Sequence, residues 1–149
     1  MAIPTALKTS NSDEWPTPQN LFDLLDLEFG FTLDPCCTKE SAKCEHFYTT
    51  NENGLLQDWG KETVFMNPPY SEVSHWMRKA FGAAQDGATV ACLIPSRTDT
   101  RWWHDYAMKG EIRFIKGRLR FGDATENAPF PSCVVVFRPK EFKLKSIYL

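Results

Sequence analysis

The chain lacks the glycine-rich motifs that hold nucleotide phosphates. Its 149 residues contain eight glycines, and these form neither the G-x-G-x-x-G pattern of dinucleotide sites nor the G-x-x-x-x-G-K-[ST] phosphate loop. The G-x-S-x-G elbow of α/β-hydrolases does not occur either. These absences exclude the standard dinucleotide, phosphate-loop and serine-hydrolase sites from the functions to be considered.

Long apolar runs and closely paired cysteines are also missing. No stretch has the length of a membrane span, and the N-terminus lacks the basic and apolar layout of a signal peptide. We therefore expect a soluble intracellular protein with reduced thiols. The five cysteines form no Cys-x-x-Cys pair, and Cys36, Cys37, Cys44 and His46 match no standard zinc spacing. The sequence predicts no metal site.

The chain has little net charge. Its 17 basic and 19 acidic residues give a formal charge of −2, which argues against a surface that binds polyanions everywhere but allows a local basic face. Apolar residues make up 42% of the chain and aromatic residues 13%, as in folded proteins. We expect a loose arm over residues 1–11 and a single domain over residues 12–149.

The sequence Asn-Pro-Pro-Tyr at residues 67–70 is the most informative stretch. It follows Thr63–Met66, a β-branched and aromatic run that predicts a buried strand. It precedes Ser71, which is expected to cap a helix that begins at Glu72 and ends near Gly87. Two consecutive prolines can neither extend the strand before them nor begin a regular helix. This stretch is therefore predicted to be a stiff loop at the carboxyl end of a strand. Open α/β sheets bind ligands at that edge.

The chemistry of this loop suits a planar amino group. Asn67 offers an amide donor and acceptor, and Pro68 offers a carbonyl acceptor. Tyr70, which follows Pro69, offers a flat face for stacking. The alternative is a strand-to-helix turn that these residues only shape, because Asn-Pro pairs are common in turns.

Two more polar loops follow predicted strands. Asp34 and Pro35 come directly after the short run 31–33, and Arg97 follows the apolar run 88–94. An acidic residue at such a strand end can receive the charged or hydroxylated part of a nucleotide-like ligand. The alternative for Asp34 is a simple Asp-Pro turn.

A helix is predicted before the first strand. Thr17 is its expected N-cap, Pro18 its first residue, and Gly30 its end. Trp15 can be interpreted in two ways. It either makes the hydrophobic contact that fixes the start of this helix, or it forms one wall of a ligand pocket.

The rest of the chain continues the alternation of helices and strands. It predicts an α/β domain with a mostly parallel sheet and helices on both faces. Asp58 either bonds an exocyclic amino group or closes a loop. The run 116–122 either binds a phosphate backbone or is a solvated strand. The remaining predicted elements are helices over 39–46 and 101–108 and strands over 47–50, 112–115 and 132–137.

Four motifs in this order resemble the phage-type DNA N-6-adenine methyltransferases, often described as Dam-like. They are Asp-Glu-Trp-x-Thr-Pro, Leu-Asp-Pro-Cys, Asn-Pro-Pro-Tyr-Ser and Pro-Phe-Pro-Ser-x-Val-Val-Val-Phe, and they span residues 13–137. The resemblance implies a Rossmann-like fold that uses S-adenosyl-L-methionine to methylate the N6 amino group of adenine in DNA. It also implies a phage or prophage protein in the cytoplasm of a bacterial host.

The resemblance also implies roles for individual residues. Asn67 and the Pro68 carbonyl would accept hydrogen bonds from the adenine amino group, and Tyr70 would stack on a base flipped out of the duplex. The implied catalytic residues are Asn67, Pro68, Pro69 and Tyr70. Those implied for the cofactor are Trp15, Thr17, Pro18, Asp34, Pro35 and Asp58, and those expected to contact DNA are Arg97, Arg118 and Arg120.

The chain departs from the wider methyltransferase pattern in two ways. The loop after Asp34 has no glycine-rich sequence, and no room remains for a separate target-recognition domain. Sequence recognition would then fall to short loops such as 123–131, to a second copy of the chain, or to an accessory partner. The alternatives are methylation of another planar amino group, on cytosine N4, an RNA base or a protein glutamine, and a catalytically idle nucleic-acid-binding module.

Overall fold

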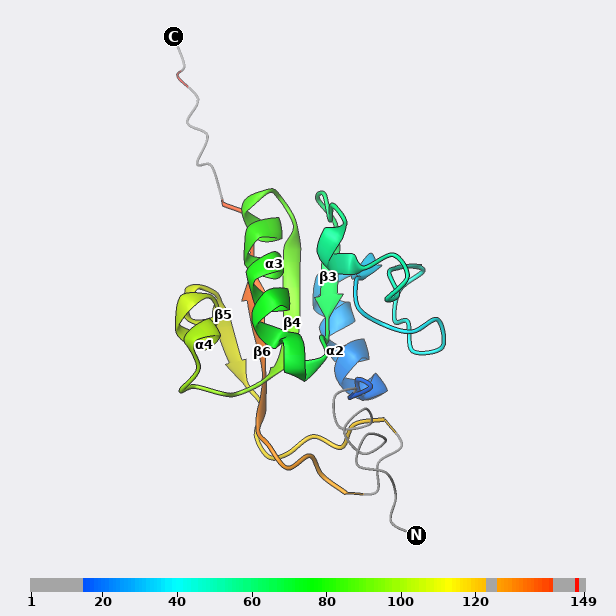
Figure 1. Ribbon diagram of the computed structural model, residues 1–149, viewed down its shortest axis with the longest axis vertical. Helices are drawn as coiled ribbons and strands as arrows, with labels where there is room; N and C mark the ends of the chain where they lie inside the picture. The colour runs from blue at the N-terminus through cyan, green and yellow to red at the C-terminus, as the bar shows by residue number, and fades with distance from the viewer. Residues whose placement is uncertain (1–14, 123–125, 141–146, 148–149) are drawn as a thin grey trace.

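A single mixed sheet organises the computed structural model, which describes residues 15–122, 126–140 and 147 (Figure 1). The strands in this part of the chain lie in the order β2-β1-β3-β4-β6-β5. They are β1 Leu33–Asp34, β2 His46–Phe47, β3 Thr63–Met66, β4 Thr89–Pro95, β5 Glu111–Phe114 and β6 Ser132–Phe137.

Four neighbouring strands of this sheet are parallel. β1 pairs in parallel with β2 and β3, and β3 pairs in parallel with β4, with Met66 level with Cys92. β6 runs antiparallel to both β4 and β5, and Ser132 is level with Pro95. The mostly parallel α/β sheet predicted from the sequence is therefore present, with one reversed strand inserted before the last.

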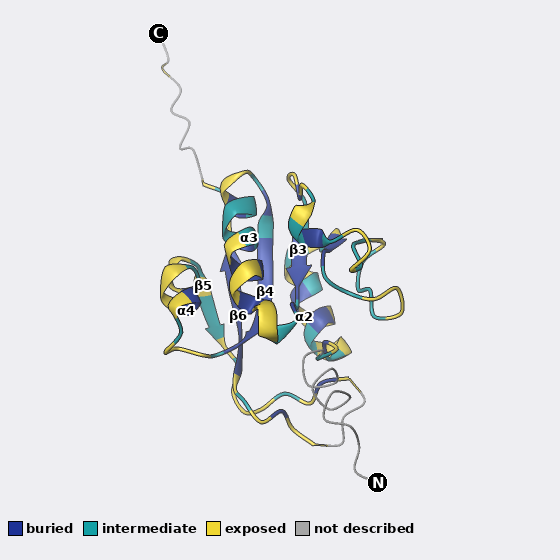
Figure 2. Ribbon diagram, viewed as in Figure 1, coloured by how far each residue is buried: buried dark blue, intermediate teal, exposed yellow. Residues whose placement is uncertain are grey.

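Helices cover both faces of the sheet (Figure 1). The apolar side of α2 packs on one face, while α3 and α4 pack on the other. Figure 2 shows β4 and β6 buried between these layers and the outer sides of the helices exposed. The helices are α2 Gln19–Phe29, α3 Val73–Gln85 and α4 Arg101–Asp105, with 3₁₀ turns at Gly54–Leu56, Tyr70–Glu72 and Ala107–Lys109.

The alternation of side chains along β3 explains this layered core. Val64 and Met66 pack in the cluster under α3, whereas Phe65 packs in the cluster under α2. β4 is buried along nearly its whole length, as its continuous apolar sequence predicts. The bounds predicted for β3 and β6 match the observed strands, because both runs are β-branched and lie in the core.

The ends of the helices differ from the prediction in two places. Gly30 ends α2 in the left-handed conformation, with φ of 66° and its N–H donating to the Asp26 carbonyl at 2.8 Å, as expected. Thr17 is not the N-cap of α2, because Pro18 occupies that position without a side-chain bond. Ser71 is not the cap of α3 either, because residues 70–72 form a 3₁₀ turn before the helix begins at Val73.

The helix predicted over residues 39–46 is wrong. This segment forms turns and bends, because its polar groups bond elsewhere. The Lys43 N–H donates to the Asp34 carboxylate at 3.0 Å, and Thr38 and Ser41 exchange side-chain bonds with each other. The strand predicted over 47–50 is shorter in the structure, where only β2 is formed. The run 116–122 has irregular structure, so the alternative that it forms a solvated strand is wrong.

The predicted arm over residues 1–11 lies outside the described residues. Within the described part of the chain, no helix is long and apolar enough to cross a membrane.

Candidate active site

The site lies where the order of the strands changes direction. From β1 the chain passes to β2 on one side and then returns to β3 on the other side. The carboxyl ends of two such strands border a crevice, which is the ligand site of open α/β sheets. Asp34 ends β1 and Asn67 follows β3, so the structure brings these two predicted site residues to the same edge.

Asn67 is held by the segment that precedes α2. Its amide nitrogen donates to the Trp15 carbonyl at 2.5 Å and to the Thr17 hydroxyl oxygen at 2.9 Å. Because a backbone carbonyl can only accept, these bonds fix which end of the amide carries the nitrogen. The other end, Oδ1, is buried and has no hydrogen-bond partner among the described residues. The buried Thr17 side chain therefore orients Asn67 instead of capping a helix.

An aromatic cluster of Trp15, Tyr70, Phe121 and Phe130 closes the space beside Asn67. Phe130 packs edge-on against Tyr70 at 5.4 Å between ring centroids and against Trp15 at 5.1 Å. Phe121 also meets both rings, at 6.4 Å and 5.4 Å. Burial raises the pKa of the Tyr70 phenol, and its hydroxyl has no partner among the described residues. The phenol is therefore not a base at neutral pH.

Phe121 and Phe130 lie beside the candidate site, although the sequence analysis included them only within the run 116–122 and the Pro-Phe-Pro-Ser motif and did not name them among the site residues. Two sequence features could have indicated them. Leu119 and Phe121 alternate with the exposed Arg118 and Arg120, and Phe130 lies in the Pro-Phe-Pro motif at residues 129–131. The structure places this loop at the carboxyl edge, beside residues 15–18, at the bottom of Figure 1.

One backbone contact fixes that position of the loop. The Gly122 N–H donates to the Pro16 carbonyl at 2.9 Å. Gly122 has φ of 53°, and a Cβ there would lie 3.3 Å from the Pro16 side chain. Glycine is needed at this position because other residues adopt this conformation with strain and meet Pro16 closely.

Asp34 is a buried carboxylate at the end of β1. It is 4% exposed, and it accepts the Lys43 N–H at 3.0 Å and the Cys36 N–H at 3.4 Å. Burial raises the pKa of Asp34, and these backbone bonds only partly oppose that effect. No cationic side chain bonds this carboxylate in the described part of the chain, since the Lys43 ammonium donates to Gln19. Pro35, directly after it, is also buried.

Cys36 joins the loops that follow β1 and β3. Its thiol accepts the Asn67 backbone N–H, and burial raises its pKa well above the ordinary value. A thiol with a raised pKa remains protonated, so Cys36 is a structural contact and not a nucleophile. No cluster of metal-ligating side chains occurs among the residues described.

The predicted DNA-contacting arginines lie around the aromatic cluster. The Arg97 guanidinium lies 5.9 Å from the centre of the Phe130 ring. Arg118 and Arg120 are exposed on the loop whose apolar residues, Leu119 and Phe121, pack inward. All three cations are thus at the same edge of the sheet as Asn67.

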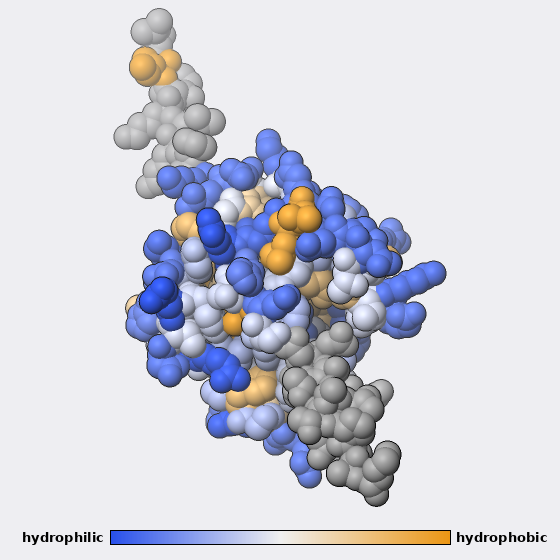
Figure 3. All heavy atoms as spheres, viewed as in Figure 1, coloured by the Kyte–Doolittle hydropathy of each residue, from blue (hydrophilic) through white to orange (hydrophobic). Residues whose placement is uncertain are grey.

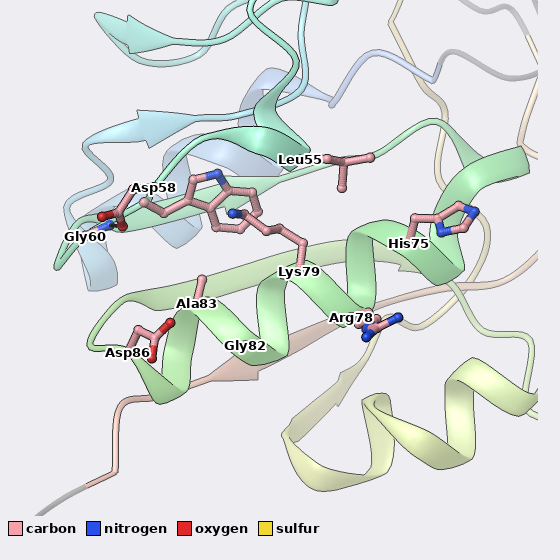
Figure 4. Close-up of a pocket in the computed structure, with 10 residues that line it drawn as sticks. Leu55, Asp58, Gly60, His75, Arg78, Lys79, Gly82, Ala83 and Asp86 are labelled. Atoms are coloured by element: carbon pink, nitrogen blue, oxygen red, sulfur yellow. Dashed lines mark hydrogen bonds between the residues drawn. The ribbon is translucent and has the colours of Figure 1, made fainter.

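The structure does not bring Asp58 to this edge. Asp58 precedes the amino end of β3, whereas Asn67 follows its carboxyl end, and the Asp58 carboxylate accepts the Gly60 N–H at 2.8 Å in a turn. Asp58 lines a hollow of about 440 Å³ along α3, which also includes Trp59 and Lys79 (Figure 4). The molecular face over α3 is mostly hydrophilic, with small separate apolar spots (Figure 3).

The fold and the site together define a class of protein. An α/β sheet with one reversed strand, and Asn-Pro-Pro-Tyr after the strand at the switch point, are the features of a Rossmann-like methyltransferase. A family model described as DNA N-6-adenine-methyltransferase (Dam) matches residues 4–147. The chain belongs to that family.

Two phage proteins described as DNA N-6-adenine-methyltransferase are similar to this chain. The protein of Haemophilus phage HP1 is 30% identical over 156 aligned positions, which cover 95% of this chain and 89% of the relative. The protein of Escherichia phage T1 is 26% identical over 151 positions, which cover 85% of this chain. The match spans 63% of the length of the T1 protein.

Proposed function

We propose that this chain transfers the methyl group of S-adenosylmethionine to the N6 amino group of adenine in DNA, with Asn67 at the reacting centre. The observation that carries the proposal is the buried Asn67 Oδ1, which has no partner among the described residues. A buried acceptor left unpaired is unfavourable by about 1–3 kcal/mol, so its retention favours a ligand that donates a hydrogen bond. The family to which the chain belongs supports adenine as that ligand.

The cofactor fits the carboxylate at the end of β1. Asp34 is buried, its pKa is raised by burial, and no described cationic side chain bonds it. Each carboxylate oxygen accepts one backbone N–H and keeps further acceptor capacity. A ligand with a positive charge would therefore compensate this group. The proposed cofactor residues are Trp15, Thr17, Pro18, Asp34 and Pro35.

The chemistry at Asn67 consists of positioning and charge stabilisation. When bound, S-adenosylmethionine supplies a methyl group attached to a positively charged sulfur. Asn67 Oδ1 and the Pro68 carbonyl accept the two hydrogens of the adenine amino group and align the nitrogen for in-line attack. Positive charge grows on N6 as the new N–C bond forms, and the two acceptors stabilise it. The alkylated amino group carries a positive charge and is acidic, so it loses one proton to solvent and needs no strong base.

The target adenine must leave the duplex to reach Asn67. Tyr70 is the proposed stacking platform, next to Pro69 in the same stiff loop. Phe121 and Phe130 now pack against Tyr70 edge-on, so entry of the base requires these rings to move apart. Once the base is bound, the same rings would exclude water from the reacting atoms.

DNA contacts are proposed for the cations at this edge. Arg97, Arg118 and Arg120 surround the aromatic cluster and can pair with backbone phosphates. We assign sequence recognition to the short loops here, assisted by a second copy of the chain or an accessory partner. The phage origin of the two relatives supports a bacterial host cytoplasm as the compartment.

Mass analysis of DNA nucleosides tests the proposed function. The full chain would be expressed in a host that lacks its own DNA methylation, with Asn67→Ala as the matched inactive variant. We expect N6-methyladenine with the wild type and none above background with the variant. N4-methylcytosine in its place would change the acceptor, and the absence of any methylated base would contradict the proposal.

A further inference from the structure

Ser132 carries a hydroxyl group that the fold leaves without a partner. It is the first residue of β6 and is 2% exposed, and its Oγ bonds no other described residue. An alanine would fill nearly the same space without burying a polar atom, so packing alone does not explain a serine here.

Ser132 and Asn67 lie on the same face of the sheet. Side chains alternate along β6, so Ser132 shares a face with Val134 and Val136, which pack in the cluster under α2. Asn67 bonds Trp15, whose ring packs against the same cluster. Both unpartnered oxygens are therefore on the α2 side of the carboxyl edge.

The spacing between the two residues is one that a base could bridge after the aromatic rings have moved apart. β4 lies between β3 and β6, and neighbouring strands are about 4.8 Å apart, so the two strands are separated by about 10 Å. Ser132 is level with Pro95, and Met66 is level with Cys92, so Ser132 lies about two residues farther toward the carboxyl edge than Asn67.

This space lies on the side of Asn67 away from the proposed cofactor site. In the order β1-β3-β4-β6, Asp34 is on β1 and Ser132 is on β6, so the two residues lie on opposite sides of β3. Phe130, which packs against Tyr70, is two residues before Ser132 in the chain. A base whose amino group meets Asn67 while its ring meets Tyr70 would have its polar edge toward Ser132.

We propose that Ser132 contacts the target base, with its hydroxyl donating a hydrogen bond to a ring nitrogen next to the amino group of adenine. This proposal rests on the proposed function. The two candidate acceptors are N1, which is bonded to the carbon that carries the amino group, and N7, which lies on the other side of the amino group and is bonded to the next ring carbon. Ser132 then aligns the ring while Asn67 and Pro68 hold the amino group.

Substrate analogues and one substitution test the contact together. Methyl transfer would be measured as kcat/KM for wild type and Ser132→Ala, on DNA with adenine, 1-deazaadenine or 7-deazaadenine at the target position. Ser74→Ala, on the exposed side of α3, is the matched control. Comparing two proteins on the same analogue cancels the intrinsic reactivity of that analogue.

We expect the wild type and Ser74→Ala to lose roughly three- to tenfold in kcat/KM on the analogue that lacks the contacted nitrogen. Ser132→Ala should lose a similar factor on normal adenine and show no further loss on that analogue. If Ser132→Ala discriminates against both analogues as strongly as the wild type, Ser132 makes no such contact and the proposal is overturned. A wild type that methylates no adenine would overturn the proposed function, and this proposal with it.

Discussion

The carboxyl edge of the sheet and the hollow beside α3 differ in how their polar groups are satisfied. In the hollow, the Lys79 ammonium donates to the Gln57 carbonyl and lies 5.4 Å from the centre of the Trp59 ring, and Asp58 accepts a turn N–H. At the carboxyl edge, Asn67 Oδ1 is buried without a partner in the described part of the chain. The hollow has volume, and its Lys79 and Asp58 side chains are paired, whereas the edge is filled by aromatic rings and keeps Asn67 Oδ1 unpaired.

If the proposed function holds, unpaired buried groups locate this site better than open space does. A satisfied polar group stabilises the fold already, whereas an unpaired one carries a cost that a bound ligand can offset. Asn67 is also constrained, because its amide nitrogen is used twice by the segment before α2. The fold itself therefore holds Asn67 Oδ1 in one orientation.

The largest predicted effect is the loss of methyl transfer in Asn67→Ala, compared with Asp58→Ala in the hollow. Asn67→Ala should lower the single-turnover rate of methyl transfer about a hundredfold or more, because one acceptor of this kind stabilises the transition state by about 3 kcal/mol. Asp58→Ala, in the hollow, should retain the wild-type rate and cofactor affinity. If Asp58→Ala were the slower of the two, the hollow would belong to the active site.

Asn67→Ala has two opposing effects on stability, because the Trp15 carbonyl and the Thr17 hydroxyl lose their donor while the unpaired Oδ1 is also removed. We expect the free energy of unfolding, measured with urea, to change by less than about 2 kcal/mol. Folding should remain cooperative, so the loss of rate cannot be assigned to unfolding.

The second effect concerns cofactor binding and its pH dependence. Asp34→Asn should weaken S-adenosylmethionine binding in calorimetry by about tenfold or more, because a buried charged partner is removed. Burial raises the pKa of Asp34, so wild-type affinity should fall as pH is lowered through that raised pKa. The variant should lack this dependence. Equal affinity of both proteins at every pH would place the cofactor elsewhere.

The same pKa shift has the opposite sign for folding. Because the pKa of Asp34 is higher in the folded state than in the unfolded state, its contribution to stability is most favourable below the unfolded value. That contribution is lost as pH rises through the folded pKa. Without cofactor, Asp34→Asn should therefore gain stability relative to the wild type as pH increases.

The third effect tests Tyr70 as a platform. Tyr70→Ala should cost about 1–3 kcal/mol in binding of the target strand, through lost stacking. Tyr70→Phe should keep nearly the full rate, because stacking uses the face of the ring and not the hydroxyl. Equal losses in the two variants, measured as kcat/KM, would give the hydroxyl a chemical role that this mechanism lacks.

The smallest effect concerns the exposed arginines. Replacing Arg118 and Arg120 together by alanine should reduce the slope of log affinity against log salt by about 2 for duplex DNA, if each pairs with one phosphate. Lys61→Ala, at the amino edge, is the control and should leave the slope unchanged. An unchanged slope in the double variant would make these arginines ordinary surface residues.

Much of the fold could be predicted because its signals are local. The β-branched run Val134–Val136 and the apolar run along β4 specify buried strands by composition alone. Asn67 was predicted at a strand end because two prolines follow it directly. The family resemblance then supplied its chemistry.

The errors come from bonds between residues distant in the sequence. Thr17 has the composition of an N-cap, but its hydroxyl bonds Asn67, 50 residues away. The segment 39–46 has helical composition, but the Asp34 carboxylate takes the Lys43 N–H nine residues away. Asp58 was grouped with Asp34 because the sequence does not say at which end of β3 a loop residue lies.

Binding of a purine-containing strand tests the central claim most directly. Purine has a hydrogen where adenine has its amino group, so the pair reports the contacts of that group to Asn67 Oδ1 and the Pro68 carbonyl without any methyl transfer. Comparing the wild type with Asn67→Ala then separates the Asn67 contact. The wild type should bind the adenine strand roughly three- to tenfold more tightly than the purine strand. Asn67→Ala should lose a large part of this preference and keep only the part that comes from the Pro68 carbonyl. An Asn67→Ala variant that keeps the full preference for adenine would show that Oδ1 does not receive the amino group, and would contradict the account.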